Sequence, residues 1–182
     1  METCVKRVHE DWTTLPQLAG LQFNKLQPLL SYGKNTADGK FIGVRYFDVC
    51  DATKRAFMQL VPSKYRPWVT ITYMEITSPY VPPHTDNCSR FSWNFYINTC
   101  DATTSFWAVS DAATTPVAFG KDGQLFQDEV KLKRIGQFKA MAHESWILNV
   151  NTIHSVNSAL PGTRTAFVIS SHHTFQDFST LL

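Results

Sequence analysis

The chain has 182 residues, of which 43% are hydrophobic and 18% charged, and its net charge is +2. This length fits one domain that can bury a hydrophobic core without cross-links from disulfides or metal ions. The composition excludes an intrinsically disordered chain, and no apolar stretch approaches the roughly 18 residues that a membrane-spanning helix needs. The weak charge balance neither demands nor excludes nucleic acid as a partner.

The cysteines and the N-terminus indicate the compartment. The four cysteines form no Cys-x-x-Cys pair and no tight cluster, and the first residues lack the apolar core of a secretory signal. Such thiols are typical of a reducing environment. We therefore expect a cytoplasmic protein, a monomer or homodimer, that does not bind a membrane.

The first 63 residues contain two segments with apolar residues at helical spacing, 15–30 and 51–60. Asp51, at the start of the second segment, is of a residue type that caps helix N-termini. Between the two segments, residues 40–47 carry the β-branched and aromatic side chains of a strand. We expect residues 1–63 to form a helical support for the rest of a single domain.

Residues 64–175 are expected to form the β core of that domain, because apolar residues there recur mostly at every second position. The run Gly-Lys-Asp-Gly at 120–123 is a hairpin-turn signal. Short strands with frequent turns favour a β-sandwich or barrel. The expected strands are 68–76, 91–98, 105–109, 117–119, 124–126, 131–135, 146–150 and 165–171.

The segment 91–98 alternates most sharply, with four apolar residues on one face. The other face carries neutral hydrogen-bonding groups: Ser92, Asn94, Tyr96 and Asn98. A strand that meets water usually carries Lys, Glu or Thr instead, so this face suits a wet cavity. An exposed polar face is the alternative.

The sequence His84-Thr-Asp86 places an imidazole and a carboxylate two residues apart, so on a strand both point the same way. A third ligand must come from a distant strand, and His154 has the best context, since it follows the apolar segment 146–150 and precedes another strand. Two imidazoles and one carboxylate can hold one face of an octahedral Fe(II) and leave three positions open. The alternatives are an aspartate-oriented histidine at a turn and a histidine satisfied in the core.

Arg164 follows His154 by ten residues and opens the apolar strand at 165–171. Pro161 and Gly162 supply a turn that would bring both residues to one cavity. An arginine that points into a barrel needs an anion, and its guanidinium fork can bind a carboxylate through two hydrogen bonds. The distal carboxylate of a dicarboxylic acid fits this requirement, and a surface strand arginine is the alternative.

His-x-Asp, a distal His and an Arg ten residues later resemble the motif set of the Fe(II)/2-oxoglutarate-dependent oxygenase superfamily. The resemblance covers roughly residues 68–175 and implies a mainly β fold, a double-stranded β-helix (jelly roll), with the N-terminal helices buttressing one sheet. It implies that His84, Asp86 and His154 hold Fe(II), and that Arg164 holds the co-substrate 2-oxoglutarate. O2 would be consumed, and succinate and CO2 released, as a substrate C–H bond is hydroxylated.

The co-substrate contacts depart from the family at one position. Several relatives place a serine two residues after the arginine to help hold the carboxylate, where this chain has Ala166. Another hydroxyl group, that of Tyr73 or Tyr96, would then have to bind the carboxylate. Tyr73 shares its strand face with apolar residues, so a core position is its alternative. Asn94 lies on the same face as Tyr96 and is a further expected co-substrate contact.

Two residues are expected substrate contacts. Arg90 follows the first histidine by six residues, where a relative that hydroxylates aspartyl side chains places an arginine, and a solvent-facing loop residue is the alternative. Trp146 is the second, with a core position as its alternative. His143, His172 and His173 carry no supporting spacing and are interpreted as structural or exposed.

The substrate is the least constrained part of the hypothesis. A loose similarity to prolyl and aspartyl hydroxylases favours a side chain of a protein or peptide, with a small molecule as the alternative. Nucleic acid is not favoured, because a demethylase would show a more basic face with stacking aromatics. The segment 110–140 is expected to act as a lid or substrate loop. The competing functions are a cupin-like metalloenzyme that does not use 2-oxoglutarate and a non-catalytic β-barrel binding or structural protein.

Overall fold

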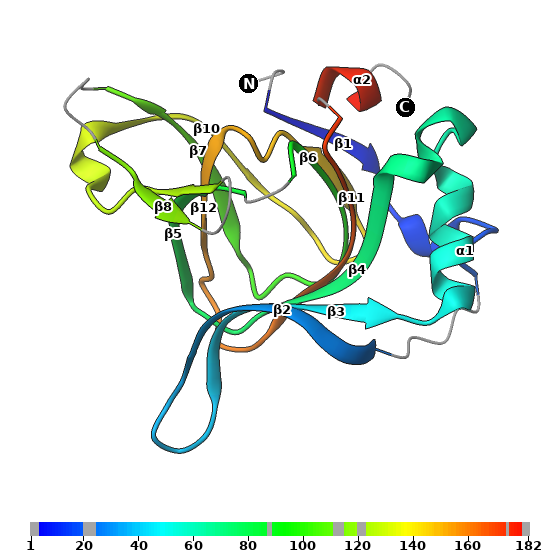
Figure 1. Ribbon diagram of the computed structural model, residues 1–182, viewed down its shortest axis with the longest axis horizontal. Helices are drawn as coiled ribbons and strands as arrows, with labels where there is room; N and C mark the ends of the chain where they lie inside the picture. The colour runs from blue at the N-terminus through cyan, green and yellow to red at the C-terminus, as the bar shows by residue number, and fades with distance from the viewer. Residues whose placement is uncertain are drawn as a thin grey trace.

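The strands form two antiparallel sheets that face each other across a common interior (Figure 1). The computed structural model describes residues 4–19, 25–86, 89–110, 115–119, 123–173 and 175–179. The helical elements are α1 (Asp51–Leu60), α2 (Phe175–Ser179) and the 3-10 turns η1 (Trp12–Thr14), η2 (Ser63–Trp68) and η3 (Glu129–Lys131). The strands are β1 (Val5–His9), β2 (Lys25–Asn35), β3 (Phe41–Val49), β4 (Val69–Ile76), β5 (Tyr80–Thr85), β6 (Phe91–Asn98), β7 (Thr103–Val109), β8 (Val117–Phe119), β9 (Gly123–Leu125), β10 (Leu132–Lys139), β11 (Ser145–Leu148), β12 (Ile153–Asn157) and β13 (Arg164–Ser171).

The strand order is that of a jelly roll. The larger sheet has the order β1-β11-β6-β13-β4-β3-β2, and the smaller has the order β10-β7-β12-β5-β9-β8. Strands that are far apart in the sequence therefore lie side by side in both sheets, as in the pair β12 and β5. The predicted mainly β, jelly-roll fold is confirmed.

The alternation of β6 separates the two faces of the larger sheet. Trp93 and Phe95 pack into a core on the outer face, next to α1. Ser92 and Asn94 point the other way and line a cavity between the sheets, while Tyr96 packs with the interior core. The predicted cavity face of this strand is confirmed for Ser92 and Asn94, although Asn98 at the strand end is exposed.

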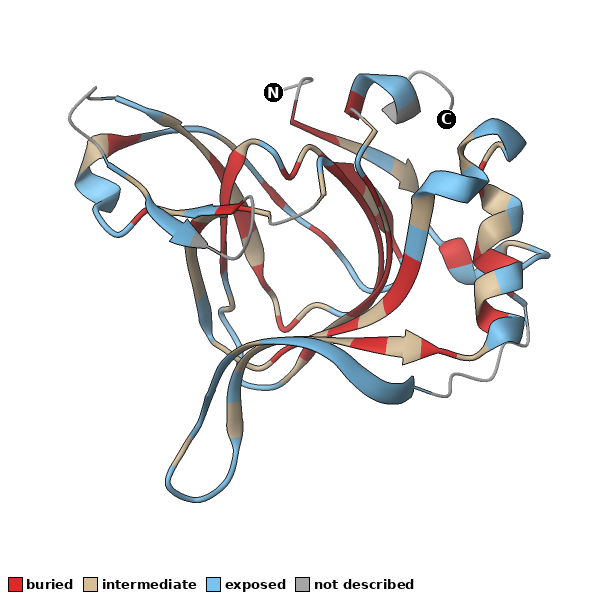
Figure 2. Ribbon diagram, viewed as in Figure 1, coloured by how far each residue is buried: buried red, intermediate tan, exposed pale blue. Residues whose placement is uncertain are grey.

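Helix α1 spans the residues predicted for it and covers the outer face of the larger sheet (Figure 2). The ring centroid of its fully buried Phe57 lies 4.9 Å from that of Phe95 and 4.8 Å from that of Phe167. The predicted cap is wrong: Cys50 occupies the N-cap position, and Asp51 is the first helical residue, where its charge complements the helix dipole. None of the helices in the described ranges is long and apolar enough to cross a membrane.

The predicted helix at 15–30 is wrong. The chain makes a turn at 16–19, residues 20–24 lie outside the described ranges, and from Lys25 onward it forms strand β2 at one edge of the larger sheet. Pro28 supplies a physical reason, because proline breaks a helix interior but is tolerated in an edge strand. The pairing with β3 shifts register on both sides of Pro28. The N-terminal support is therefore one helix and a β-hairpin.

Strands β2 and β3 form a long hairpin whose tip projects from the barrel (Figure 1). Gly33 and Gly43 lie opposite each other in this hairpin, and both have a φ of 152°. A Cβ atom on Gly33 would collide with the carbonyl oxygen of Ile42, and one on Gly43 would collide with that of Tyr32. Only glycine fits at either position, so the two backbones approach closely at this pair.

Two smaller differences concern strand ends. Strand β1 was not predicted, and it extends the larger sheet by pairing with β11. The predicted turn at 120–123 lies outside the described residues except for Gly123. The strands that flank it, β8 and β9, pair antiparallel, with Val117 opposite Leu125.

We expect Phe57→Ala to lower the free energy of unfolding by about 3–5 kcal/mol, because it leaves a cavity among packed aromatic rings. Urea denaturation followed by circular dichroism measures the loss. Val130→Ala is the matched control: Val130 is 93% exposed, and its truncation should stay within about 0.5 kcal/mol of wild type. Equal stabilities of the two variants would contradict the packing of α1 against the sheet.

Candidate metal centre

His84 and Asp86 lie at the end of β5, and His154 lies near the start of β12. Because His84 is directly opposite His154 in the antiparallel pairing of these strands, their ring centroids are only 4.3 Å apart. The backbone N–H of Asp86 donates to the carbonyl of Val150 at 3.1 Å, which holds Asp86 beside them. One ligand atom from each of the three residues lies within 4.8 Å of the others, so the trio could hold a metal ion.

Both imidazoles are turned so that Nε2 faces the carboxylate. Nδ1 of His84 donates to the carbonyl of Pro82 at 2.8 Å, and Nδ1 of His154 donates to that of Thr152 at 3.0 Å. The Nε2 atoms lie 3.4 Å and 3.6 Å from the same carboxylate oxygen, Oδ1 of Asp86. A hydrogen bond at one ring nitrogen fixes the tautomer that leaves the other free to bind a metal.

The charges of the trio also suit a cation. Burial, with the nearby His84 as a second cause, lowers the pKa of His154 to about 4. Burial alone would raise the pKa of Asp86, but the hydrogen bond from His84 and the charges of both imidazoles hold it below its usual range. Burial by itself would lower the pKa of His84, but the hydrogen bond with Asp86 and the charge of Asp86 raise it. A neutral imidazole at His154 and an ionised carboxylate at Asp86 are thus in place for a cation.

Arg164 is buried with most of its hydrogen-bonding capacity unused. It opens β13 in the larger sheet, and its side chain crosses the interior to β7, where Nη2 donates to Oγ1 of Thr104 at 3.4 Å. The guanidinium carbon lies 4.8 Å from the ring centroid of Tyr96. Arg164 is 3% exposed, and within the described part of the chain its Nε and Nη1 have no hydrogen-bond partner. A buried cation with free donors is costly unless an anion meets it.

An inner cavity of about 60 Å³ joins the two groups, since His84, Asp86, His154 and Arg164 all line it. The candidate metal ligands and the unpaired guanidinium therefore share one compartment inside the barrel. Such an arrangement can bind a metal and an anion together.

Asn94 connects the inner cavity to a chain of hydrogen bonds along β6. Its Oδ1 accepts from Oγ of Ser92 at 2.6 Å, and its Nδ2 donates to the hydroxyl of Tyr96 at 3.2 Å. All three side chains are buried. These hydrogen bonds fix the hydroxyl group of Tyr96, whose ring lies beside Arg164.

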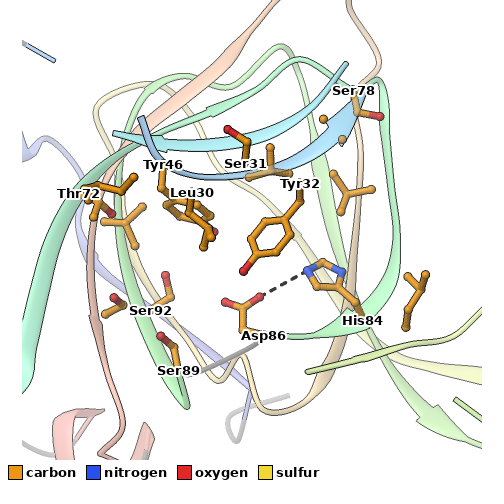
Figure 3. Close-up of a pocket in the computed structure, with 18 of the residues that line it drawn as sticks. Leu30, Ser31, Tyr32, Tyr46, Thr72, Ser78, His84, Asp86, Ser89 and Ser92 are labelled. Carbon is orange, nitrogen blue, oxygen red and sulfur yellow. Dashed lines mark ion pairs between the residues drawn. The ribbon is translucent and has the colours of Figure 1, made fainter. Parts of the chain in front are cut away.

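A larger cavity of about 940 Å³ adjoins the inner one. Figure 3 shows His84 and Asp86 at one side of it, with the ring of Tyr32 turned toward them and Thr72 and Ser92 on another side. The two cavities share the following lining residues: Val44, Tyr46, Val81, His84, Asp86 and Ser92. A molecule in this outer cavity would therefore reach the candidate metal ligands.

The structure brings some predicted site residues together and leaves others apart. His84, Asp86, His154, Arg164 and Asn94 line the inner cavity, and Tyr96 packs beside Arg164.

Three predicted residues lie elsewhere. Tyr73 faces the outer core, where its ring centroid is 5.4 Å from that of Phe167. Arg90 is exposed just before β6 and lines neither cavity. Trp146 is half-buried, with its ring centroid 4.6 Å from that of Phe138 and its indole N–H donating to Glu144.

Sequence reasoning missed Tyr46, which lines both cavities. Burial and the charge of Asp86 raise its pKa, while Arg164 acts in the opposite sense, so its hydroxyl stays protonated near both charged groups. The signal for this residue was present: in the predicted strand 40–47, the alternate residues Ile42, Val44 and Tyr46 fall on one face, and all three line the outer cavity. Tyr32 and His172 also line it, but neither lay in a pattern that pointed there.

Comparison with known proteins gives distant likenesses to solved structures. No family model and no curated protein matches the chain. It is similar to the non-haem epimerase SnoN, solved in complex with Fe3+, alpha ketoglutarate and nogalamycin RO, with 13% identity and a TM-score of 0.46 over 78% of this chain and 67% of that one.

Other similar structures include the following two. One is Bacillus subtilis oxalate decarboxylase, with 13% identity and a TM-score of 0.41 over 81% of this chain and 28% of that one. The other is ycfD of E. coli, with 10% identity and a TM-score of 0.44 over 76% of this chain and 40% of that one. Identities this low say nothing about the reaction. The resemblance to prolyl and aspartyl hydroxylases receives no support from these structures and stays a prediction.

We expect wild-type protein to bind one Fe(II) and His154→Ala to bind it far more weakly. The loss should exceed the roughly 10–100-fold that results when even an outer partner of a metal ligand is removed. Anaerobic equilibrium dialysis followed by metal analysis measures it. His143→Ala is the control, because His143 is exposed and lines neither cavity. Equal iron content in the two variants would rule out the trio as the metal site.

Proposed function

We propose that this chain is an Fe(II)- and 2-oxoglutarate-dependent oxygenase that hydroxylates a C–H bond of its substrate. His84, Asp86 and His154 form the two-imidazole, one-carboxylate donor set that suits Fe(II) and leaves coordination positions open. The hydrogen bonds that aim both Nε2 atoms at the carboxylate support this assignment.

The free donors of Arg164 carry the proposal. A guanidinium in the compartment of a divalent metal would weaken metal binding by charge repulsion if nothing lay between them. A dicarboxylate that reaches from the metal to Arg164 would compensate both positive charges and satisfy Nε and Nη1. 2-Oxoglutarate has the second carboxylate that this arrangement requires. A site that bound only a metal ion would have no need of the buried Arg164.

The chain's other residues would orient this co-substrate. Thr104 and the ring of Tyr96 hold the guanidinium in place from two sides. Tyr46 lines the inner cavity together with Arg164. It is the candidate second partner of the distal carboxylate, the role that we first expected of Tyr73 or Tyr96. Val150 and Val156 line the same cavity and help to exclude water from it.

When bound, Fe(II), 2-oxoglutarate and O2 supply the conversion of a C–H bond to C–OH, with succinate and CO2 as the other products. The protein contributes the geometry of the ligands and an anion site at a fixed place relative to them. A cytoplasmic setting and a monomeric or homodimeric state remain predictions.

We expect a visible charge-transfer band when wild-type protein is titrated anaerobically with Fe(II) and 2-oxoglutarate. His84→Ala should give no band, because the metal is lost. Arg164→Met should require at least about 30-fold more 2-oxoglutarate, since it removes one partner of a buried charge pair. Arg90→Met is the matched control, because this exposed arginine lines neither cavity, and it should titrate like wild type.

The same variants separate the proposal from its alternatives. A cupin-like metalloenzyme that does not use 2-oxoglutarate would bind the metal but show no succinate release, and Arg164→Met would leave its metal chemistry unchanged. A non-catalytic binding or structural protein would not retain iron. An unchanged band in both His84→Ala and Arg164→Met would exclude the assigned roles of these residues.

A further inference from the structure

We propose that the substrate of this site is a neutral small molecule with an apolar body and a hydrogen-bonding edge. It would bind in the outer cavity, against the β2–β3 hairpin and a row of hydroxyl groups on the neighbouring strands of the same sheet. This inference rests on the proposed function, because it names the substrate class for that site. The cavity volume of about 940 Å³ lies at the upper end of the roughly 300–1,000 Å³ that is common for drug-sized ligands.

The hairpin side of the cavity carries exposed apolar side chains beside Ser31, Tyr32 and Lys34. Leu29, Leu30 and Ile42 line it, although they are 53%, 46% and 38% exposed. Single exposed apolar residues need no explanation, but several around one cavity mark a surface that a ligand covers. Val44 continues this apolar side inward to the inner cavity.

The lining next to the hairpin carries a row of hydroxyl groups across three neighbouring strands of the same sheet. Ser170 of β13 lies directly opposite Thr70 of β4 and directly opposite Ser92 of β6. Thr72 lies two residues further along β4, and all four residues line the outer cavity. Figure 3 shows two of them, Thr72 and Ser92.

These hydroxyls have spare hydrogen-bonding capacity. Ser92 donates to Asn94, whereas the side chains of Thr70, Thr72 and Ser170 make no hydrogen bond to any part of the chain that the structure describes. A hydroxyl can donate and accept without carrying charge. The row therefore fits a ligand edge of carbonyl or hydroxyl groups.

The cavity is poor in charge. Apart from Asp86 and the imidazoles, Lys34 is the one charged side chain among its described lining residues. Single-stranded nucleic acid binds through a positively charged groove, and a charged peptide needs complementary charges along its path. Neither is provided here, so a neutral ligand is favoured over the protein side chain that the sequence resemblance implied.

The site can be tested with prodan, a neutral naphthalene ketone whose fluorescence reports the polarity and hydrogen bonding of its surroundings. We expect saturable binding of one prodan per chain to the metal-free protein. Leu30→Glu and Ile42→Glu should each weaken binding by at least about tenfold, because a charge is placed against the apolar ligand. Leu160→Glu is the matched control, since Leu160 is 57% exposed and lies outside both cavities.

The hydroxyl row predicts a second, spectroscopic result. Thr72→Val and Ser170→Ala should weaken prodan binding by roughly fivefold each, the effect of one lost hydrogen bond. The emission of the bound dye should also shift to shorter wavelength, because its carbonyl loses a donor. Absence of saturable binding, or binding that is equal in Leu30→Glu and Leu160→Glu, would overturn the proposed binding site.

Turnover separates this inference from the proposed function. Succinate release by the Fe(II)-loaded protein should be accelerated by a pool of neutral apolar small molecules, and not by pools of peptides or single-stranded DNA. Acceleration by peptides or DNA alone would overturn the inference and leave the oxygenase proposal standing. Prodan binding with the expected variant effects, without any iron-dependent succinate release, would contradict the oxygenase proposal and leave the ligand class of the cavity standing.

Discussion

The buried guanidinium of Arg164 is the constraint on which the interior of this barrel depends. It lies across the space between the two sheets, where Thr104 and the ring of Tyr96 hold it, and two of its nitrogen atoms meet no partner in the described chain. Burying a cation in this way costs free energy that folding alone does not recover. The cost is understandable if the anion that completes the site is a ligand.

The metal trio depends on a simpler constraint, the pairing of two short strands. Because β5 and β12 place His84 opposite His154, the imidazoles must lie next to each other. In each case the backbone carbonyl two residues earlier accepts the Nδ1 hydrogen, from within β5 for His84 and from just before β12 for His154, and this sets the orientation of the ring. Asp86, just beyond the strand, then completes the set with little freedom of its own.

The sequence predicted the parts of the structure that follow from local pattern. Period-two alternation located β6 and its cavity face, and helical spacing located α1. The approach of His84, Asp86 and His154 was predicted from their strand context and from the resemblance to a family. The role of each residue in binding a ligand remains a prediction.

The failures have physical reasons. Leu29 and Leu30 line the outer cavity and do not pack into the core. Apolar residues that line a cavity need not alternate as core residues of a strand do, so this segment was predicted to be a helix. Tyr73 was expected at the co-substrate, but the strand alternation carries it to the outer core beside Phe167. Tyr46 was missed because its importance arises from the larger sheet, which brings β3 to the interior near both Asp86 and Arg164.

The central claim is that one ligand spans the metal and Arg164, and calorimetric titration tests it most directly. Mn(II)-loaded and metal-free protein would each be titrated with 2-oxoglutarate and with glutarate, which has both carboxylates but no keto group. The account predicts that the metal raises the affinity for 2-oxoglutarate by more than roughly fivefold, a typical coupling between sites, and changes the affinity for glutarate much less. An affinity for 2-oxoglutarate that does not depend on the metal would contradict it.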